Sequence, residues 1–232
     1  MEGFTPVYAK PGSPILVAGP TGCGKTRWVH RALTGRAIFQ HQPQKIMYCY
    51  GVDQAFYRTM KTELGDSIDF KEGLPSVDEV ANLNCEDCED SIFNVIVLDD
   101  LMDKVVANKE MEELFTQLCH HFRISTIFIS QNIYQKGAHS RTISLNCHIN
   151  VLFRNARDES QAHTFARQVC PSSPRTFLEA YKDAVQRDYG YFVLDATPTT
   201  PQELRWRTNL FPGESPFNRV TTYTPLVKND FC

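Results

Sequence analysis

A glycine-rich segment at residues 19–26 has the residue types and spacing of a loop that binds nucleotide phosphates. It fits the pattern G-x-x-x-x-G-K-[ST] and lies between an apolar run and a segment of helical periodicity. Glycines let successive backbone N–H groups turn toward a phosphate, and the positive end of the following helix adds to that field. The residues predicted to contact the nucleotide are Gly19, Pro20, Thr21, Gly22, Cys23, Gly24, Lys25 and Thr26.

Two residues of this loop have specific chemical roles. The Lys25 ammonium would bind the β- and γ-phosphates as a point charge, and the Thr26 hydroxyl would ligate Mg²⁺. The alternative is a glycine-rich turn that contains Lys-Thr by chance. The pattern is too rare at average composition for that alternative to be favoured.

Two adjacent acids end the most apolar run of the chain, at residues 92–98. Asp99 would hold the metal through its water shell, and Asp100 beside it would polarise the attacking water. Two acids that merely cap a strand end are the simpler alternative. The phosphate loop favours the functional interpretation, because a Mg²⁺–nucleotide site needs a carboxylate on a neighbouring strand.

Polar residues also follow the apolar run at 126–130. In a parallel sheet this end lies on the same rim as Asp99 and the phosphate loop. Gln131 can therefore offer its amide to the γ-phosphate or to the attacking water. The alternative is that Gln131 and Asn132 only form a turn.

The elements that must position these groups alternate in type. Strands are predicted at residues 14–19, 45–50, 92–98, 126–130 and 149–153, with a possible short strand at 68–70. Helices are predicted near residues 25–33, 54–64, 76–84, 106–122, 159–169 and 174–185. This alternation indicates an α/β fold with a mostly parallel central sheet flanked by helices on both faces.

The end of the chain departs from this alternation. Residues 191–194 and 204–210 would pair as a C-terminal β-hairpin. Residues 1–212 are predicted to form a single domain. Residues 213–232 contain prolines and little apolar periodicity, so they are predicted to be a poorly ordered tail.

Composition limits the classes of protein to be considered. The chain has 232 residues, 42% hydrophobic and 22% charged, which is typical of a folded domain. No apolar run approaches the roughly 20 residues of a membrane helix, and residues 1–10 lack the features of a secretory signal. Eight cysteines spread over the chain do not form a compact disulfide framework, so an intracellular protein is expected.

Charge is distributed unevenly although the net charge is only −3. Residues 63–113 contain sixteen Asp and Glu against three Lys, and the remainder is correspondingly basic. A nucleic-acid binder is therefore not excluded by net charge. The simpler interpretation of the acidic stretch is a solvated surface.

The ordered set of motifs resembles the genome-packaging ATPases of the FtsK/HerA superfamily. The resemblance is greatest to the packaging ATPase of Polinton/Maverick elements and adintoviruses, in the poxvirus A32-like group. The loop and the strand ending at Asp99 correspond to its Walker A and Walker B motifs. The matching stretches are residues 19–26, 49–51, 72–75, 98–102 (LDDLM), 114–116, 120–121, 130–132 (SQN), 141–146, 151–158, 189–195 and 205–212 (RWRTNLFP).

The resemblance implies a RecA/FtsK–HerA-like P-loop NTPase that uses ATP and Mg²⁺. It implies a homo-oligomeric ring that moves double-stranded DNA into a capsid, with a capsid or portal protein as partner and no membrane. The location would be the host nucleus or the site of virion assembly. It assigns Lys25 and Thr26 to nucleotide and Mg²⁺, Asp99 to Mg²⁺, Asp100 to water activation and Gln131 to sensing. Relatives commonly have Glu where this chain has the shorter Asp100.

A ring ATPase also needs an arginine that reaches the γ-phosphate of the neighbouring subunit. Arg141 is favoured and Arg154 is the alternative; either could be a surface arginine. The residues that could contact DNA phosphates are Lys109, Lys136, Arg141, Arg154, Arg157 and Arg167. The loop at 136–138 is the favoured pore element, although a plain connection is the simpler interpretation.

Three alternatives remain open. A P-loop kinase would transfer the γ-phosphoryl group to a small acceptor, and a nucleotide-gated capsid-assembly subunit would bind ATP without turnover. Cys85 and Cys88 have the spacing of metal ligands, but only His120 and His121 could complete a tetrahedral zinc site. An acidic surface loop is therefore favoured over zinc.

Overall fold

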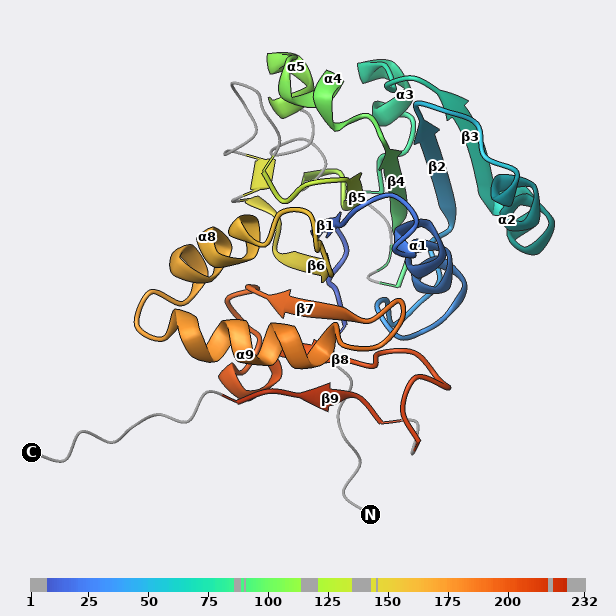
Figure 1. Ribbon diagram of the computed structural model, residues 1–232. Coiled ribbons are helices and arrows are strands. Elements are labelled where there is room, and N and C mark those ends of the chain that lie inside the picture. Colours follow the sequence, from blue (N-terminus) through green and yellow to red (C-terminus); the bar gives the residue numbers. More distant parts are fainter. Residues whose placement is uncertain are drawn as a thin grey trace, which may run out of the picture.

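One sheet runs through the whole molecule (Figure 1). The computed structural model describes residues 8–85, 89, 91–113, 121–134, 143–144, 146–216 and 219–224. Within these residues the strands lie in the order β3-β2-β4-β5-β1-β6-β7-β8-β9. They are β1 (Pro14–Ala18), β2 (Lys45–Tyr50), β3 (Ile68–Glu72), β4 (Asn94–Asp99), β5 (Ile124–Ser130), β6 (Ile149–Phe153), β7 (Tyr191–Asp195), β8 (Trp206–Thr208) and β9 (Thr221–Thr222).

The first six strands in this order, β3-β2-β4-β5-β1-β6, pair in parallel, as the alternation of apolar runs and helical segments predicts. Every residue of β4 and β5 is buried, because helices cover both faces of this part of the sheet. One face packs against α1 (Lys25–Thr34) and α2 (Phe56–Leu64). The other packs against α3 (Val77–Ala81), α4 (Met102–Val106), α8 (Ser160–Val169) and α9 (Pro174–Ala184).

The helix predicted at 106–122 is wrong at its start. The structure has α4 ending at Val106 and a separate short helix, α5 (Lys109–Glu113), after it. The side-chain oxygen of Asn108 accepts a hydrogen bond from the backbone N–H of Met111 at 3.3 Å, which caps the start of α5. Residues 114–120 lie outside the described part of the chain. At α3 the predicted cap is present, because Ser76 and Glu79 form a capping box.

The C-terminal strands are antiparallel. β7 pairs with β6 and with β8, so the predicted hairpin is present. A buried ion pair joins its strands, since Arg207 Nη2 lies 2.7 Å from Asp195 Oδ2. The ordered structure also continues beyond residue 212, where the sequence predicts a tail: β9 adds to β8, and residues 213–216 pack on the domain. Residues 225–232 lie outside the described part.

Candidate functional site

The phosphate loop connects β1 to α1 as predicted. Gly24 caps the helix with φ of 104°, a conformation that favours glycine. A Cβ on Gly19 would lie only 2.6 Å from the Cβ of Phe153, so this position has no room for a side chain. The first turn of α1 contains no acidic residue, so the positive end of the helix stays available to an anion.

The Lys25 ammonium lies against its own loop. Its Nζ donates hydrogen bonds to the carbonyl oxygens of Gly19 at 2.6 Å and Pro20 at 2.9 Å. Both are neutral acceptors. A phosphate oxygen is a stronger, charged acceptor, so the ammonium is held within the loop in a position from which it can bind one.

Strand order brings the remaining predicted residues to the same rim. β5 lies between β1 and β4, so Gln131 follows the strand beside the phosphate loop. Asp99 ends the next strand, β4, and Asp100 comes directly after it. The Gln131 amide donates to Asp100 Oδ1 at 3.2 Å. Asp100 has φ of 57°, which turns the chain sharply after the buried strand.

These groups line one cleft of about 360 Å³. Its walls combine the phosphate loop, the ends of β4 and β5, and residues from two other segments. The lining residues are Thr21, Gly22, Gly24, Lys25, Thr26, Arg27, Gln54, Asp99, Asp100, Ile129, Ser130, Gln131 and Tyr189. The predicted site residues that the structure describes therefore gather at one rim, and Arg141 lies outside the described residues.

Asp99 is the buried member of the acidic pair, with only 4% of its surface exposed. Its Oδ2 accepts hydrogen bonds from the hydroxyls of Tyr48 at 2.7 Å and Tyr57 at 3.0 Å. Burial raises the pKa of the Asp99 carboxyl, while the two hydroxyls and the Lys25 charge oppose that rise. Asp100 is exposed, so the two adjacent carboxyls have different environments.

The donor set suits Mg²⁺. Thr26, Asp99 and Asp100 contribute a hydroxyl and carboxylates to the same cleft, and Mg²⁺ prefers oxygen ligands. The predicted metal ligands, Thr26 and Asp99, would hold the ion together with the phosphates. When bound, it would supply positive charge to the phosphate oxygens.

Several residues that line the cleft or contact its aspartate escape sequence reasoning. Tyr48 and Tyr57 have the sequence context of core residues, and each contacts a carboxylate more than 40 positions away. Tyr189 has φ of 57° and is exposed beside the loop, where a Cβ on Gly24 would meet its ring at 3.1 Å. A signal for Tyr189 was available in the Tyr-Gly-Tyr segment of the matched motifs. No pattern indicated Gln54.

Cys23 and Cys85 have different surroundings. Burial raises the pKa of the Cys23 thiol despite the nearby Lys25, so the loop gives no sign of an activated thiolate. Cys85 is buried and accepts a hydrogen bond from Asn94 at 3.1 Å, so it does not lie on a solvated loop. Cys88 and His120 lie outside the described residues, within which no cluster of three metal-binding side chains occurs.

Three of the predicted DNA-contacting residues, Arg154, Arg157 and Arg167, have exposed side chains. Arg154 borders a cavity that Gly22 and Cys23 of the same chain also line. Lys109 is exposed as well, but it pairs with Glu113 at 3.4 Å. The predicted pore loop at 136–138 lies outside the described residues.

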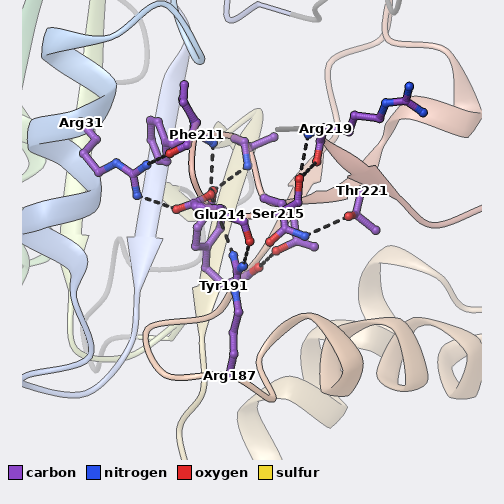
Figure 2. A network of polar contacts seen from close by, with 12 residues as sticks. Arg31, Arg187, Tyr191, Phe211, Glu214, Ser215, Arg219 and Thr221 are labelled. Carbon is purple, nitrogen blue, oxygen red and sulfur yellow. Dashed lines mark hydrogen bonds and ion pairs between the residues drawn. The ribbon is translucent and has the colours of Figure 1, made fainter. Parts of the chain in front are cut away.

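A second carboxylate network contacts the last turn of α1 (Figure 2). The Glu214 carboxylate accepts hydrogen bonds from Arg31 of α1 at 2.7 Å, Tyr191 of β7 at 2.5 Å and the backbone N–H of Phe211 at 3.1 Å. Arg187 donates to the Glu214 backbone carbonyl. This network ties the segment after β8 to the helix that begins at the phosphate loop.

Solved structures with a similar fold include two viral packaging proteins. The DNA-packaging ATPase B204 from Sulfolobus Turreted Icosahedral Virus has a TM-score of 0.56 at 9% identity, covering 94% of this chain and 100% of that one. The genome packaging NTPase B204 from Sulfolobus turreted icosahedral virus 2, in complex with ATP-γS, has a TM-score of 0.56 at 10% identity. That match covers 83% of this chain and 96% of the other. No family model and no curated protein matches the sequence.

At this level of identity the likeness establishes the fold. The chain shares with these two B204 proteins an α/β fold with a mostly parallel sheet between helices. Among the described residues, no helix is both long and apolar enough to cross a membrane.

Proposed function

We propose that this chain is an ATPase that translocates double-stranded DNA and packages the genome of a virus or virus-like element into a capsid. The observation that carries the proposal is the cleft in which Lys25, Asp99, Asp100 and Gln131 meet. The fold shared with viral packaging ATPases supports the same activity.

Each residue has a role in hydrolysis that its position supports. The loop N–H groups and Lys25 bind the β- and γ-phosphates and stabilise the charge that develops there. Asp100 accepts the proton of the attacking water. Gln131, which donates to Asp100 at 3.2 Å, orients that water and senses the γ-phosphate. Thr26 and Asp99 would hold Mg²⁺, which would supply positive charge to the phosphates.

The active form in this proposal is a homo-oligomeric ring bound to a capsid or portal protein. Arg141 completes the neighbouring subunit's site, with Arg154 as the alternative. Arg154 borders this chain's own phosphate loop, which supports a role in its own subunit and leaves Arg141 as the favoured trans residue. The Polinton/Maverick and adintovirus packaging ATPases remain the proposed family, acting in the nucleus or at the site of virion assembly.

Contacts to DNA would be made to phosphates. The exposed Arg154, Arg157 and Arg167 and the loop at 136–138 are the proposed donors. Phosphate contacts carry no sequence information and weaken steeply with salt, because binding releases counterions. DNA binding should therefore be independent of sequence.

The test is phosphate release from ATP with Mg²⁺, with and without double-stranded DNA, at low and moderate salt. We expect DNA to raise the rate of ATP hydrolysis at low salt. At moderate salt the rate with DNA should fall back to the rate without DNA. Lys25→Ala, which removes the main charge on the γ-phosphate, is the control for contaminating ATPases. Near-normal turnover in that variant would contradict the nucleotide assignment.

The same assay separates the alternatives. A kinase would release little phosphate until a small acceptor is added, and DNA would have no effect. A nucleotide-gated assembly subunit would assemble with ATP and release no phosphate. Its Asp100→Asn variant would assemble in the same way as the wild type. Either result would contradict the motor.

A further inference from the structure

The two oxygens of the Asp99 carboxylate have different surroundings. Oδ2 accepts both tyrosine hydroxyls, at 2.7 and 3.0 Å. In the described part of the chain, no donor reaches Oδ1. Because Asp99 lines the cleft together with Lys25 and Thr26, one of its oxygens is fixed by the protein and the other is left for a ligand.

The two tyrosines reach Asp99 from separate elements. Tyr48 lies on β2, where Tyr50 pairs with Asp99 of β4. Residues two apart in a strand share a face, so Tyr48 and Asp99 lie on the same face as diagonal neighbours. Tyr57 lies on the first turn of α2, which covers that face. The carboxylate is therefore held by one tyrosine from the neighbouring strand and by another from the helix that covers the sheet.

Ring packing fixes where the hydroxyls lie. The ring centroids of Tyr48 and Tyr57 are 5.0 Å apart, and each lies 5.1 Å from that of Phe70. Tyr48 is fully buried and Tyr57 is 4% exposed. Neither ring has space to swing away, so the hydroxyls are held in place by packing before any ligand binds.

We propose that Tyr48 and Tyr57 are positioning residues that hold Oδ2 of Asp99 and so direct Oδ1 toward the shell of a nucleotide-bound Mg²⁺. The proposal rests on the proposed function. Groups that hydrogen-bond a metal-binding carboxylate set its orientation, and their loss typically weakens metal affinity about 10- to 100-fold. A ligand held by locked side chains also loses little freedom when the metal arrives.

The competing explanation is that the tyrosines only fill the core and neutralise a buried carboxylate. Phenylalanine would then serve nearly as well at both positions, apart from a loss of stability. The two explanations differ in the Mg²⁺ dependence of nucleotide binding, which a purely structural role leaves unchanged.

The experiment uses Tyr48→Phe, Tyr57→Phe and the double variant of the full chain. Tyr223→Phe is the matched control, because its hydroxyl donates to Asp183 Oδ2 at 2.6 Å, away from the cleft. Binding of a fluorescent, non-hydrolysable ATP analogue is measured across a Mg²⁺ titration and again in EDTA. Circular dichroism checks that each variant is folded.

We expect the Mg²⁺ concentration at half-maximal binding to rise about tenfold in the double variant and less in each single variant. Affinity in EDTA should equal that of the wild type, and Tyr223→Phe should match the wild type in both arms. An unchanged Mg²⁺ midpoint, or an equal loss with and without Mg²⁺, would overturn the proposal. If the double variant does not fold, the single variants decide the question on the same criteria.

The wild-type control separates this proposal from the one on which it rests. Wild-type binding that does not respond to Mg²⁺ would remove the metal–nucleotide site and the tyrosine role with it. Wild-type binding that responds normally, with variants that respond identically, would contradict the tyrosine role alone.

Discussion

Asp99 and Glu214 are both carboxylates that accept hydrogen bonds from tyrosine hydroxyls, and those tyrosines belong to the same core cluster on one face of the sheet. Glu214 uses both oxygens within the protein, on Arg31, Tyr191 and the backbone of Phe211 (Figure 2). Asp99 uses only Oδ2 and opens onto the cleft. The difference distinguishes a carboxylate that joins segments of the fold from one that is kept available for a ligand.

The largest expected effect comes from Asp99→Asn. The amide keeps the size and an acceptor for the tyrosine hydroxyls, but it removes the charge that would hold Mg²⁺. Mg²⁺-dependent ATP hydrolysis should fall by about 1,000-fold, corresponding to roughly 4 kcal/mol of transition-state stabilisation. The melting temperature should stay the same or rise, because a buried charge is removed.

Phosphate-release kinetics and thermal unfolding on the same preparation test this pair of outcomes. Substantial turnover in a folded Asp99→Asn protein would show that Asp99 is structural, like Glu214, and would remove the contrast.

Glu214→Ala should give the opposite result. It leaves the Tyr191 hydroxyl and the Phe211 N–H without their acceptor, so we expect a loss of about 3 kcal/mol of unfolding free energy. For a chain of this length that lowers the melting temperature by roughly 6–12 °C. At a temperature where the variant is folded, the Mg²⁺ midpoint for nucleotide binding should be unchanged.

Scanning calorimetry and urea unfolding measure the effect, with Glu203→Ala as the control, since Glu203 is exposed on a short 3₁₀ turn. A Glu214→Ala protein as stable as this control would contradict the structural role.

Tyr191→Phe removes from Glu214 the same kind of hydroxyl that Tyr48 and Tyr57 donate to Asp99. The same substitution removes one hydroxyl from Glu214, which keeps its bonds from Arg31 and Phe211. The Tyr191 hydroxyl also accepts from the backbone N–H of Leu210, so stability should fall by about 1–2 kcal/mol. Nucleotide titration should show the wild-type Mg²⁺ response; a shifted midpoint would mean that both networks act on the metal.

The smallest effect is expected from a partly exposed carboxylate, Glu79. Lys71 pairs with it and lowers its pKa to about 2, and side-chain exposure is 38%. Glu79→Gln keeps the capping box while removing the ion pair. After allowance for solvent screening, the cost at pH 7 should be about 0.5 kcal/mol.

The pH dependence of that cost has a definite sign. Because the folded-state pKa lies below the unfolded value, the stabilisation is present above about pH 4.5 and is lost as the pH falls toward 2. Urea unfolding of wild type and Glu79→Gln at pH 7 and pH 2.5 checks this. A difference between the two that persists undiminished at pH 2.5 would exclude the ion pair as its source.

Patterns within short stretches of sequence predicted the parallel strands and the position of the candidate site. Apolar runs located the parallel strands, and because their carboxyl ends share a rim, Gln131 and Asp99 could be predicted at one site. The break before α5 was missed because Asn108 caps a helix through its side chain within a stretch of continuous helical periodicity.

The remaining misses involve partners far apart in the sequence. Tyr48 and Tyr57 have apolar rings that suit a core, and nothing beside them marks Asp99 as the acceptor of their hydroxyls. Glu214 lies in a proline-containing segment without periodicity, so it was assigned to a tail. Its partner Arg31 is 183 positions earlier, a separation that local patterns do not address.

That separation also has a consequence for the order in which the protein is made. At the roughly 5–20 residues per second of translation, Glu214 is synthesised about 10–40 seconds after Arg31. A nascent chain can form β1 and the phosphate loop long before the carboxylate that anchors the following helix exists. The Glu214 contact therefore forms late in synthesis, and a chain stalled before residue 214 would expose an unanchored α1 to chaperones.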